Sequence, residues 1–180
     1  MSIKIPAGFS LIEGERPIWY GRMSWKANWF LILPGLLLLA VGIGVILLII
    51  AALRVISTEY FITNKRTYIK YGIISRYTFD LKNEWITNYT VYQGFIGRLL
   101  GFGDILVSTP GYYTGTVMMK GVSNPMHLKV ILEGALQKMK KSREIEETLR
   151  KIEMEYEMGR LPKEKYEELK KKYEEELRKL

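Results

Sequence analysis

Residues 57–72, which read Ser-Thr-Glu-Tyr-Phe-Ile-Thr-Asn-Lys-Arg-Thr-Tyr-Ile-Lys-Tyr-Gly, carry the clearest structural pattern in the chain. β-Branched and aromatic residues fill 58–63 and 66–71, and residues of these types favour strands. Asn64-Lys65 between the two runs is typical of a tight turn, and Gly72 ends the second run. The pattern therefore predicts two antiparallel strands joined by a short turn.

Downstream of this hairpin the pattern of short strands continues, and a helix follows it. The short apolar run 95–100 has the length of a single helical turn, and Asn124-Pro125 is typical of a helix start. Apolar residues then recur at roughly helical spacing as far as Met139. Six or seven strands closed by one helix predict an α+β fold, namely a small β-barrel or sandwich of antiparallel strands capped at one end. The further strands are expected at 75–81, 84–92, 104–109 and 114–122.

Upstream of the hairpin lies a long apolar run. Residues 27–53 have no charged side chain, and Asn28 is the only polar one. As one helix this run reaches about 40 Å, against about 30 Å of bilayer hydrocarbon, which predicts a tilted transmembrane segment over 27–54. Four Lys or Arg residues lie within reach on each side, so the positive-inside rule assigns no orientation.

Features inside the apolar run support a competing interpretation. Pro34-Gly35, Gly42 and Gly44 all weaken a helix, so a short re-entrant hairpin is the alternative to a single span. In either arrangement Trp25 and Trp29 are expected at the headgroup level, as membrane-interface anchors.

The C-terminal part of the chain is strongly charged. Residues 138–180 hold 14 Lys or Arg and 12 Asp or Glu. Apolar residues at helical spacing in 145–156 and again in 166–180 flank a Gly/Pro-containing turn, which predicts a helical hairpin over 141–180. Because a hairpin this short buries little apolar area by itself, a protein partner or self-association through 144–180 is expected. A solvated tail with no binding role is the alternative.

Composition excludes several kinds of chemistry. The 180-residue chain has no cysteine and one histidine, so neither a thiolate nor a multi-histidine metal site is possible, and no cofactor is expected. His127 is expected to pack or to cap a helix. The acids between the apolar run and the tail are too scattered for an acid–base pair, which predicts a non-enzyme. The net charge of +8 is spread along the chain, which argues against a nucleic-acid partner.

Basic residues follow the apolar run closely. Cations beside an anionic membrane surface each gain about 1 kcal/mol. We therefore consider these cations candidates for binding lipid headgroups, although four or five solvated charges would give the same pattern. The candidates are Arg54, Lys65, Arg66, Lys70 and Arg76.

A series of motifs resembles a known family. In order, they are Glu13-Gly14-Glu15 leading to Trp25, Ile62-Thr63-Asn64-Lys65-Arg66, Gly72, Arg76, Tyr92-Gln93, Arg98-Leu99-Leu100-Gly101-Phe102-Gly103 and Asn124-Pro125. Together they resemble bacterial and archaeal pleckstrin-homology-like (PH-like) membrane proteins, over about residues 11–138. In many relatives the membrane segment is a two-span hairpin. The resemblance implies functional or structural roles at Thr63, Arg66, Gly72, Gln93, Arg98, Gly101 and Gly103.

The tail resembles a second family. The helix–glycine–turn–charged-helix pattern from Tyr156 to Leu169 is similar to the short C-terminal domain, or SHOCT. With both resemblances, the expected organisation is a leader (1–26), a transmembrane segment (27–54), a PH-like domain (55–140) and a SHOCT-like hairpin (141–180).

The expected function follows from this organisation. The resemblance implies an integral membrane protein of the cell membrane, with its PH-like domain in the cytoplasm. It would be a non-enzymatic binding module that holds a protein partner or an assembly at the membrane surface. Two alternatives are a module that binds or senses anionic lipid headgroups and a homo-oligomeric membrane scaffold.

Overall fold

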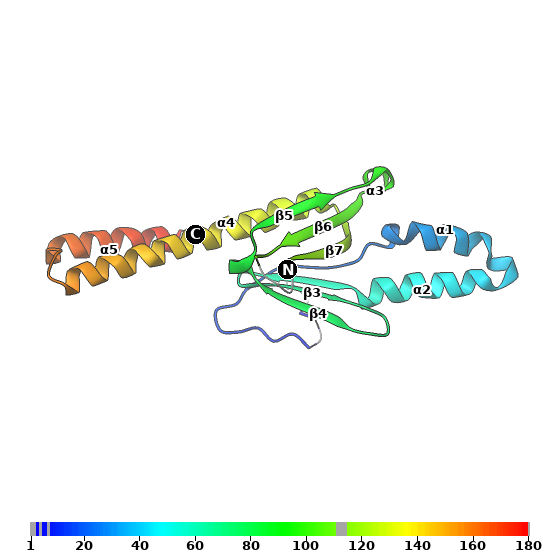
Figure 1. The fold of residues 1–180 in the computed structure, drawn as a ribbon, viewed down its shortest axis with the longest axis horizontal. Coiled ribbons are helices and arrows are strands. Elements are labelled where there is room, and N and C mark those ends of the chain that lie inside the picture. Colours follow the sequence, from blue (N-terminus) through cyan, green and yellow to red (C-terminus); the bar gives the residue numbers. More distant parts are fainter. Residues whose placement is uncertain (1–2, 4, 7, 111–114, 180) are drawn as a thin grey trace. The chain divides into compact units, whose positions relative to one another are not determined.

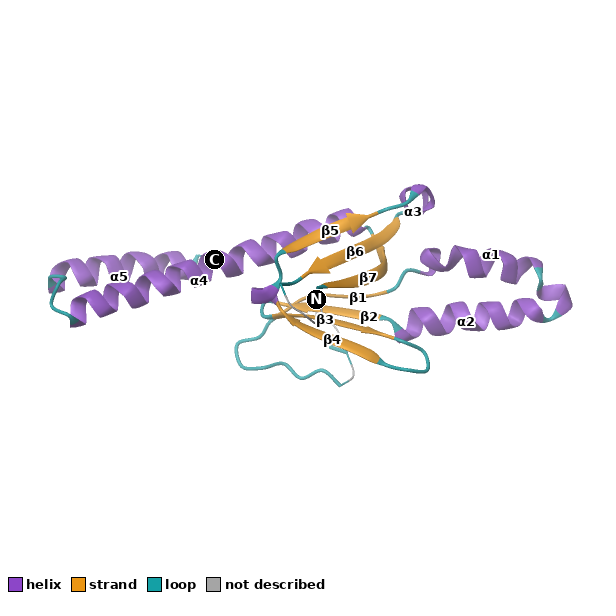
Figure 2. Cartoon of the chain, in the orientation of Figure 1, coloured by secondary structure: helices purple, strands orange, loops and turns teal. Residues whose placement is uncertain are grey.

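The computed structural model describes all residues except 1–2, 4, 7, 111–114 and 180. Its strands form two antiparallel sheets (Figures 1 and 2). The four-stranded sheet has the order β1 (Pro17–Arg22), β2 (Glu59–Thr63), β3 (Arg66–Tyr71) and β4 (Tyr77–Lys82). The three-stranded sheet has the order β5 (Asn88–Tyr92), β6 (Phe102–Ser108) and β7 (Thr116–Ser123).

The core is built around β2, whose five residues are all buried. Successive side chains of a strand point to opposite faces, so both faces of β2 are covered. On one face the Tyr60 hydroxyl donates a 2.6 Å hydrogen bond to the Lys120 carbonyl of β7, which links the two sheets. On the other, the ring of Phe9 from the leader packs edge-on against Phe61, with 4.9 Å between the ring centroids.

The predicted strands agree well with those observed, with one clear difference. The expected strand 84–92 begins only at Asn88, because Asn83–Trp85 forms a 3-10 turn (η3). Buried Asn83 holds this turn, since its side chain accepts a 2.9 Å hydrogen bond from the Thr67 hydroxyl and donates one to the Thr63 carbonyl. The short helix α3 (Phe95–Leu100) is the helical turn expected there. The predicted start of the last strand, residue 114, lies outside the described residues.

One strand was not predicted. β1 lies in the leader, upstream of the apolar run, and pairs with β2 in register from Arg22↔Glu59 to Tyr20↔Phe61. The PH-like boundary expected at residue 55 therefore leaves out an edge strand of the first sheet. The apolar run is an insertion between two neighbouring strands.

The apolar run folds as a helical hairpin and not as one helix. After a 3-10 turn, η1 (Trp25–Asn28), come α1 (Trp29–Leu37), the 3-10 turn η2 (Leu39–Val41) and α2 (Ile43–Ser57). Gly42 reverses the chain in the left-handed conformation, with φ of 79°. Gly44 faces Gly35 so closely that a methyl group on residue 44 would overlap the Gly35 carbonyl oxygen.

This hairpin corrects the fold class and the localisation that the sequence suggested. Among the described residues, no helix combines the length and apolar character needed to cross a membrane. The transmembrane segment predicted at 27–54 is therefore wrong, and so is the integral-membrane localisation that rested on it. The α+β architecture with two antiparallel sheets stands.

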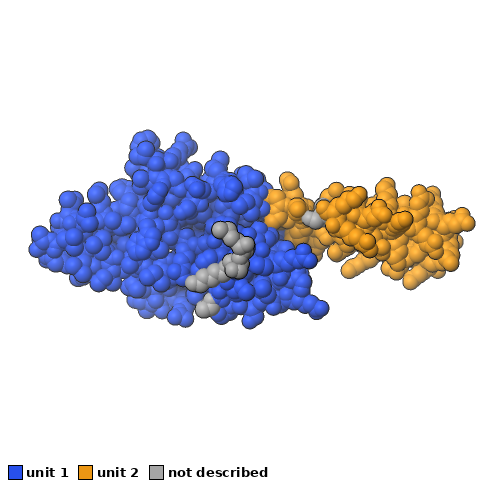
Figure 3. Space-filling view, turned by 180° about the vertical axis from the view of Figure 1, so that it is seen from behind, with its two compact units in different colours: residues 1–133 blue, residues 134–180 orange. Residues whose placement is uncertain are grey.

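The chain divides into two compact units, residues 1–133 and 134–180 (Figure 3). Helix α4 (Pro125–Glu157) begins in the first unit and continues into the second, so the two helices expected before the Gly/Pro turn are one. Gly159, with φ of 71°, lies in the turn before α5 (Lys163–Arg178). In the second unit, Tyr156 stacks on Tyr166 at 4.3 Å between ring centroids, and Lys141 forms a 2.8 Å ion pair with Glu176.

Candidate functional site

The five predicted headgroup candidates do not form one cluster. Lys65 and Arg66 lie at the β2–β3 turn, whereas Lys70 and Arg76 lie toward the other end of β3. The length of β3 separates these two ends by about 16 Å, at about 3.3 Å per residue. Arg54 is in the last turn of α2, directly before β2, and so belongs to the Lys70 end.

At the first end, Arg66 is held by structural contacts. Its guanidinium forms a 2.8 Å ion pair with Glu15 and a 2.7 Å ion pair with Asp80. It also donates to the Ser10 carbonyl at 2.9 Å and lies 4.5 Å from the centroid of the Phe9 ring. Arg66 therefore ties the leader to the first sheet.

Glu15 is the buried partner in this cluster, with an exposed fraction of 7%. Burial opposes its charged form, but hydrogen bonds from Arg66, the Ile12 N–H and the Thr63 hydroxyl outweigh burial and lower the pKa of Glu15 to about 2. Lys65 also binds the leader, because its ammonium donates to the Glu13 carbonyl at 2.6 Å. This end of the sheet is a structural clamp.

Lys70 is likewise paired. Its ammonium lies 3.4 Å from the Glu59 carboxylate. Glu59 also forms a 2.9 Å ion pair with Arg22 and accepts a 2.9 Å hydrogen bond from the Tyr20 hydroxyl. Burial raises the pKa of Glu59, but these donors outweigh it and leave the pKa below its usual value. The pairs join β1, β2 and β3 beside the base of the hairpin.

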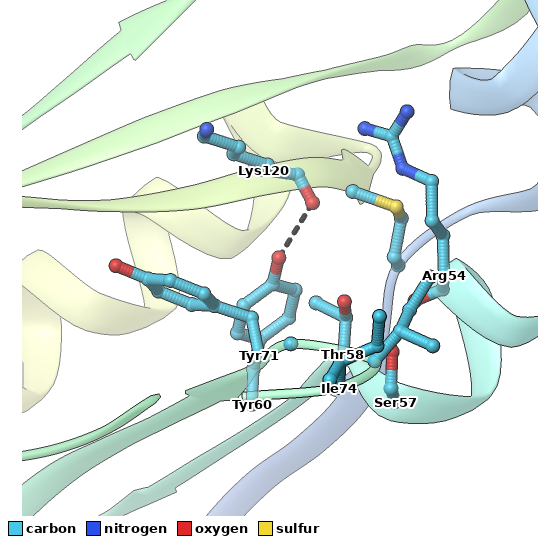
Figure 4. Close-up of a pocket in the computed structure, with 10 residues that line it drawn as sticks. Arg54, Ser57, Thr58, Tyr60, Tyr71, Ile74 and Lys120 are labelled. Carbon is cyan, nitrogen blue, oxygen red and sulfur yellow. Dashed lines mark hydrogen bonds between the residues drawn. The ribbon is translucent and has the colours of Figure 1, made fainter. Parts of the chain in front are cut away.

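The remaining candidates, Arg54 and Arg76, lie at the hairpin end without an ion pair among the described residues. Arg54 lies over the Phe30 ring of α1, 5.2 Å from its centroid. It also lines a pocket of about 470 Å³ at the base of the hairpin (Figure 4). The pocket is lined by Met23, Arg54, Ser57, Thr58, Tyr60, Tyr71, Gly72, Ile73, Ile74 and Lys120.

Lys120 is the cation of the pocket that the sequence analysis did not name as a candidate. It lies in β7, where residues 117, 119 and 121 are buried and Lys120 is exposed. Strand alternation predicts that Lys120 lies on an outer face of the sheet. No pattern in the neighbouring sequence predicts that it lines the same pocket as Arg54. The Tyr60 hydroxyl binds the Lys120 carbonyl, and burial raises the pKa of Tyr60, so this hydroxyl remains a donor.

Large apolar side chains are exposed around this end of the molecule. The β3–β4 turn exposes Ile73 and Ile74, and Ile74 is 97% exposed. The short helix α3 exposes Phe95 and Leu99. It follows β5 and precedes β6, whose first residue pairs with Ser123 at the end of β7. The hairpin adds exposed residues from both of its helices and from the turn between them, namely Trp29, Phe30, Leu33, Leu36, Leu37, Leu38, Leu39, Val41, Ile43, Val45, Ile46, Ile49, Ile50, Leu53 and Ile56.

The predicted interface anchors lie at the base of this hairpin. Trp25 is in η1 and Trp29 begins α1, and both are exposed. Two further tryptophans lie elsewhere: Trp19 is in β1, and Trp85 is in η3. Because η3 follows Lys82, which pairs with Arg66, exposed Trp85 lies at the clamp end of the first sheet.

The family-motif positions outside the clamp support turns and tight packing. Gly72 has φ of 117° and Gly101 has φ of 76°, which favours glycine at both positions. A methyl group on Gly103 would lie 2.7 Å from the Tyr92 carbonyl oxygen, and the adjoining Gln93 side chain donates a 2.9 Å hydrogen bond to the Phe102 carbonyl. Arg98 is exposed in the last turn of α3.

Thr63, the remaining motif position, is fully buried. Its hydroxyl donates to Glu15 at 2.7 Å and accepts from the Arg66 N–H at 2.8 Å, so it completes the clamp at the β2–β3 turn.

Within the described residues, no group of three or more His, Asp or Glu side chains could hold a metal ion. His127 is exposed in the first turn of α4. The site combines the exposed apolar α1–α2 hairpin, a pocket at its base, and cations beside it that form no ion pair among the described residues. These are features of a binding surface.

Comparison with known proteins gives one family. Neither the curated proteins nor the solved structures include a significant match to this chain. The sequence pattern of the bacterial PH domain matches residues 26–140, which includes the hairpin and both sheets apart from β1. The chain therefore belongs to the bacterial PH domain family.

Proposed function

We propose that this protein is a non-enzymatic PH-like binding module that docks on an anionic membrane surface through the end that carries the α1–α2 hairpin. PH-like domains are in general binding modules. The observation that carries the proposal is the exposed apolar surface of the hairpin. Monomeric proteins rarely expose apolar patches of more than a few hundred Å² unless the patch binds something.

The distribution of apolar residues favours lipid over a protein groove. An amphipathic helix that enters a protein groove presents one apolar stripe and keeps a polar face. Between Lys26 and Arg54 the hairpin has no charged residue on any face, and its only polar side chain, Asn28, is buried. Lipid covers such a surface on every side at once.

The length of the hairpin favours shallow insertion. Helix α2 has 15 residues, about 22 Å at 1.5 Å per residue. A complete bilayer with its headgroup regions is about 40–45 Å thick, so α2 reaches about halfway. The hairpin is therefore too short to cross the bilayer and would contact only the leaflet on which the protein docks.

The base of the hairpin has the residues that suit a headgroup layer. Trp25 and Trp29 are exposed there, and aromatic rings of this kind favour the membrane interface. Lys26, Arg54 and Arg76 lie at the same end, and each cation beside anionic lipid gains about 1 kcal/mol. The exposed Ile73 and Ile74 would lie against the same layer.

Binding of a protein partner through the tail, and the likeness to SHOCT, remain predictions. In the second unit the apolar stripes of α4 and α5 contact each other through Tyr156 and Tyr166. The pair of helices α4 and α5 thus covers part of the apolar area that a partner was expected to bury. A membrane-bound PH-like domain that carries this tail would bring the tail to an assembly at the membrane.

The proposal is tested with two single-tryptophan forms of the full chain. One retains only Trp29 and the other only Trp85, with phenylalanine at the remaining tryptophans. Mixed with phosphatidylcholine–phosphatidylglycerol vesicles that contain brominated acyl chains, the Trp29 form should shift to the blue and be quenched. The Trp85 form, exposed at the clamp end, should be unchanged.

A hairpin variant provides the second arm. Residues 29–53 are replaced by a short Gly-Ser linker, which keeps β1, η1 and Arg54. This variant should keep its sheet signature in circular dichroism and should no longer float with vesicles. Equal quenching of Trp29 and Trp85, or flotation without the hairpin, would contradict the proposal.

A further inference from the structure

The pocket at the base of the hairpin is composed of residues from four separate parts of the chain. Met23 follows β1, residues 54–60 span the end of α2 and the start of β2, residues 71–74 form the β3–β4 turn, and Lys120 comes from β7. Its volume of about 470 Å³ lies in the range of small-molecule sites. In Figure 4 the Lys120 carbonyl faces the Tyr60 hydroxyl, and the Lys120 ammonium points away from the Arg54 guanidinium.

The charges around the pocket suit an anion. Arg54 and Lys120 both line it, and among the described residues neither forms an ion pair with a carboxylate. Two acids lie on the strands beside the pocket. Glu59 is occupied by Arg22, Lys70 and Tyr20, and Asp104 of β6 accepts a 2.7 Å hydrogen bond from the N–H of Gly121, next to Lys120. Two cations at one cavity, neither of them in an ion pair, attract a negatively charged group, and a guanidinium is well shaped for phosphate oxygens.

The neutral part of the lining suits the rest of a lipid head. Ser57, Thr58 and Tyr71 place hydroxyl groups around the cavity, while Met23, Ile73 and Ile74 give it apolar walls. The Tyr60 hydroxyl is already used by the Lys120 carbonyl. A ligand with a charged head, hydroxyls nearby and an apolar continuation would match this lining.

The hairpin supplies that continuation. Arg54 and Ser57 belong to the last turn of α2, and the preceding turns of α2 expose Ile46, Ile49, Ile50 and Leu53. We infer that the pocket binds the phosphodiester headgroup of an anionic phospholipid, with Arg54 and Lys120 supplying the positive charge and the acyl chains following α2. This inference rests on the proposed membrane docking and adds a defined headgroup site to it.

The experiment compares vesicle flotation of the full chain with variants at each wall of the pocket. The variants are Arg54→Gln, Lys120→Gln and the double substitution, and the matched control is Arg76→Gln, a cation at the same end that does not line the pocket. Vesicles of phosphatidylcholine carry equal surface charge from either phosphatidylglycerol or a fatty acid. The first anion offers a phosphodiester, and the second offers only a carboxylate.

The wild type should prefer phosphatidylglycerol over the fatty acid. Each pocket substitution should weaken binding to phosphatidylglycerol about fivefold, the equivalent of about 1 kcal/mol, and the double variant should lose the preference. Arg76→Gln should keep the preference. Arg54→Lys should keep more of the preference than Arg54→Gln does. The circular dichroism spectra of all variants should be the same.

Three outcomes would overturn the site. The pocket variants could keep the wild-type preference, Arg76→Gln could remove it equally, or free glycerol phosphate could displace the protein from vesicles at low concentration, which would identify a soluble phosphate as the ligand. If wild type binds no vesicle, including pure phosphatidylcholine, the membrane docking itself fails. If the wild type binds vesicles but the pocket substitutions do not change its preference, only the headgroup site is contradicted.

Discussion

At the scale of single residues, the Glu15–Arg66 pair shows how the leader is held to the first sheet. The Glu15 carboxylate accepts from the Arg66 guanidinium, the Ile12 N–H and the Thr63 hydroxyl, at 2.7 to 3.0 Å. A buried carboxylate with these donors is stable as an anion, whereas removing its charge leaves Arg66 with one partner fewer. The pair therefore contributes to the stability of the fold.

Glu15→Gln should destabilise the protein by about 3 kcal/mol at neutral pH, because the pKa falls from 4.5 to about 2 on folding and each pKa unit corresponds to about 1.36 kcal/mol. The depressed pKa means that this contribution is complete above about pH 4.5 and is lost as the pH falls toward 2. Urea unfolding at a series of pH values measures it. The wild type should lose stability between these limits, and the variant should lose less.

Glu13→Gln is the matched control for this prediction. Glu13 is exposed and lies two residues away, and its backbone carbonyl, not its carboxylate, accepts from Lys65. The control should unfold like the wild type. Equal unfolding free energies for Glu15→Gln and Glu13→Gln would show that the clamp does not stabilise the fold.

At the scale of elements, two glycines allow α1 and α2 to pack closely. Gly35 and Gly44 are both buried within the hairpin, and a methyl group on Gly44 would meet backbone atoms of Gly35, Leu38 and Leu39. Backbone cannot move aside as a flexible side chain can. The hairpin therefore depends on a missing side chain at this crossing.

Gly44→Ala should destabilise the hairpin by about 1–3 kcal/mol, the usual cost of overpacking. Gly134→Ala is the matched control, because Gly134 lies inside α4 with open space where its methyl group would be. Alanine there should raise helix stability by up to about 1 kcal/mol. Thermal unfolding followed by circular dichroism at 222 nm measures both, and shifts of the same sign would contradict the packing argument.

At the scale of the whole molecule, the chain separates an apolar and basic unit from a charge-balanced tail. Residues 143–180 carry 11 Lys or Arg and 12 Asp or Glu, so the positive excess of the chain lies before them. The hairpin and the pocket also belong to the first unit, residues 1–133. Membrane docking should therefore be a property of that unit.

A chain that ends at residue 142 should bind phosphatidylglycerol vesicles within about fivefold of the full chain, because fivefold corresponds to the 1 kcal/mol of a single juxtamembrane cation. Flotation at low and high salt measures this, with circular dichroism to verify that the sheets persist. Loss of binding on truncation would place the docking surface in the tail.

Local patterns in the sequence were sufficient for strands β2 to β7 and for α3. The run 57–72 predicted β2 and β3 because side-chain alternation and turn residues act over a few positions. The motif glycines at 72, 101 and 103 were recognisable for the same reason, since each serves a turn or a close approach beside it. The apolar run was also evident, but its composition suits one long helix as well as two short ones.

Contacts between distant parts of the chain could not be found in this way. β1 pairs with β2 across residues 23–58, and its strand-favouring run Ile18-Trp19-Tyr20 is too short, between Pro17 and Gly21, to predict a strand alone. The reversal of the apolar run depends on Gly44 lying against Gly35, and the five cations separate because β3 carries them to opposite ends of one sheet. Arg54 and Lys120 meet at one pocket because strands β2 and β7 are linked through Tyr60. These residues come close together only when the chain is folded, and the local periodicity of the sequence does not predict such contacts.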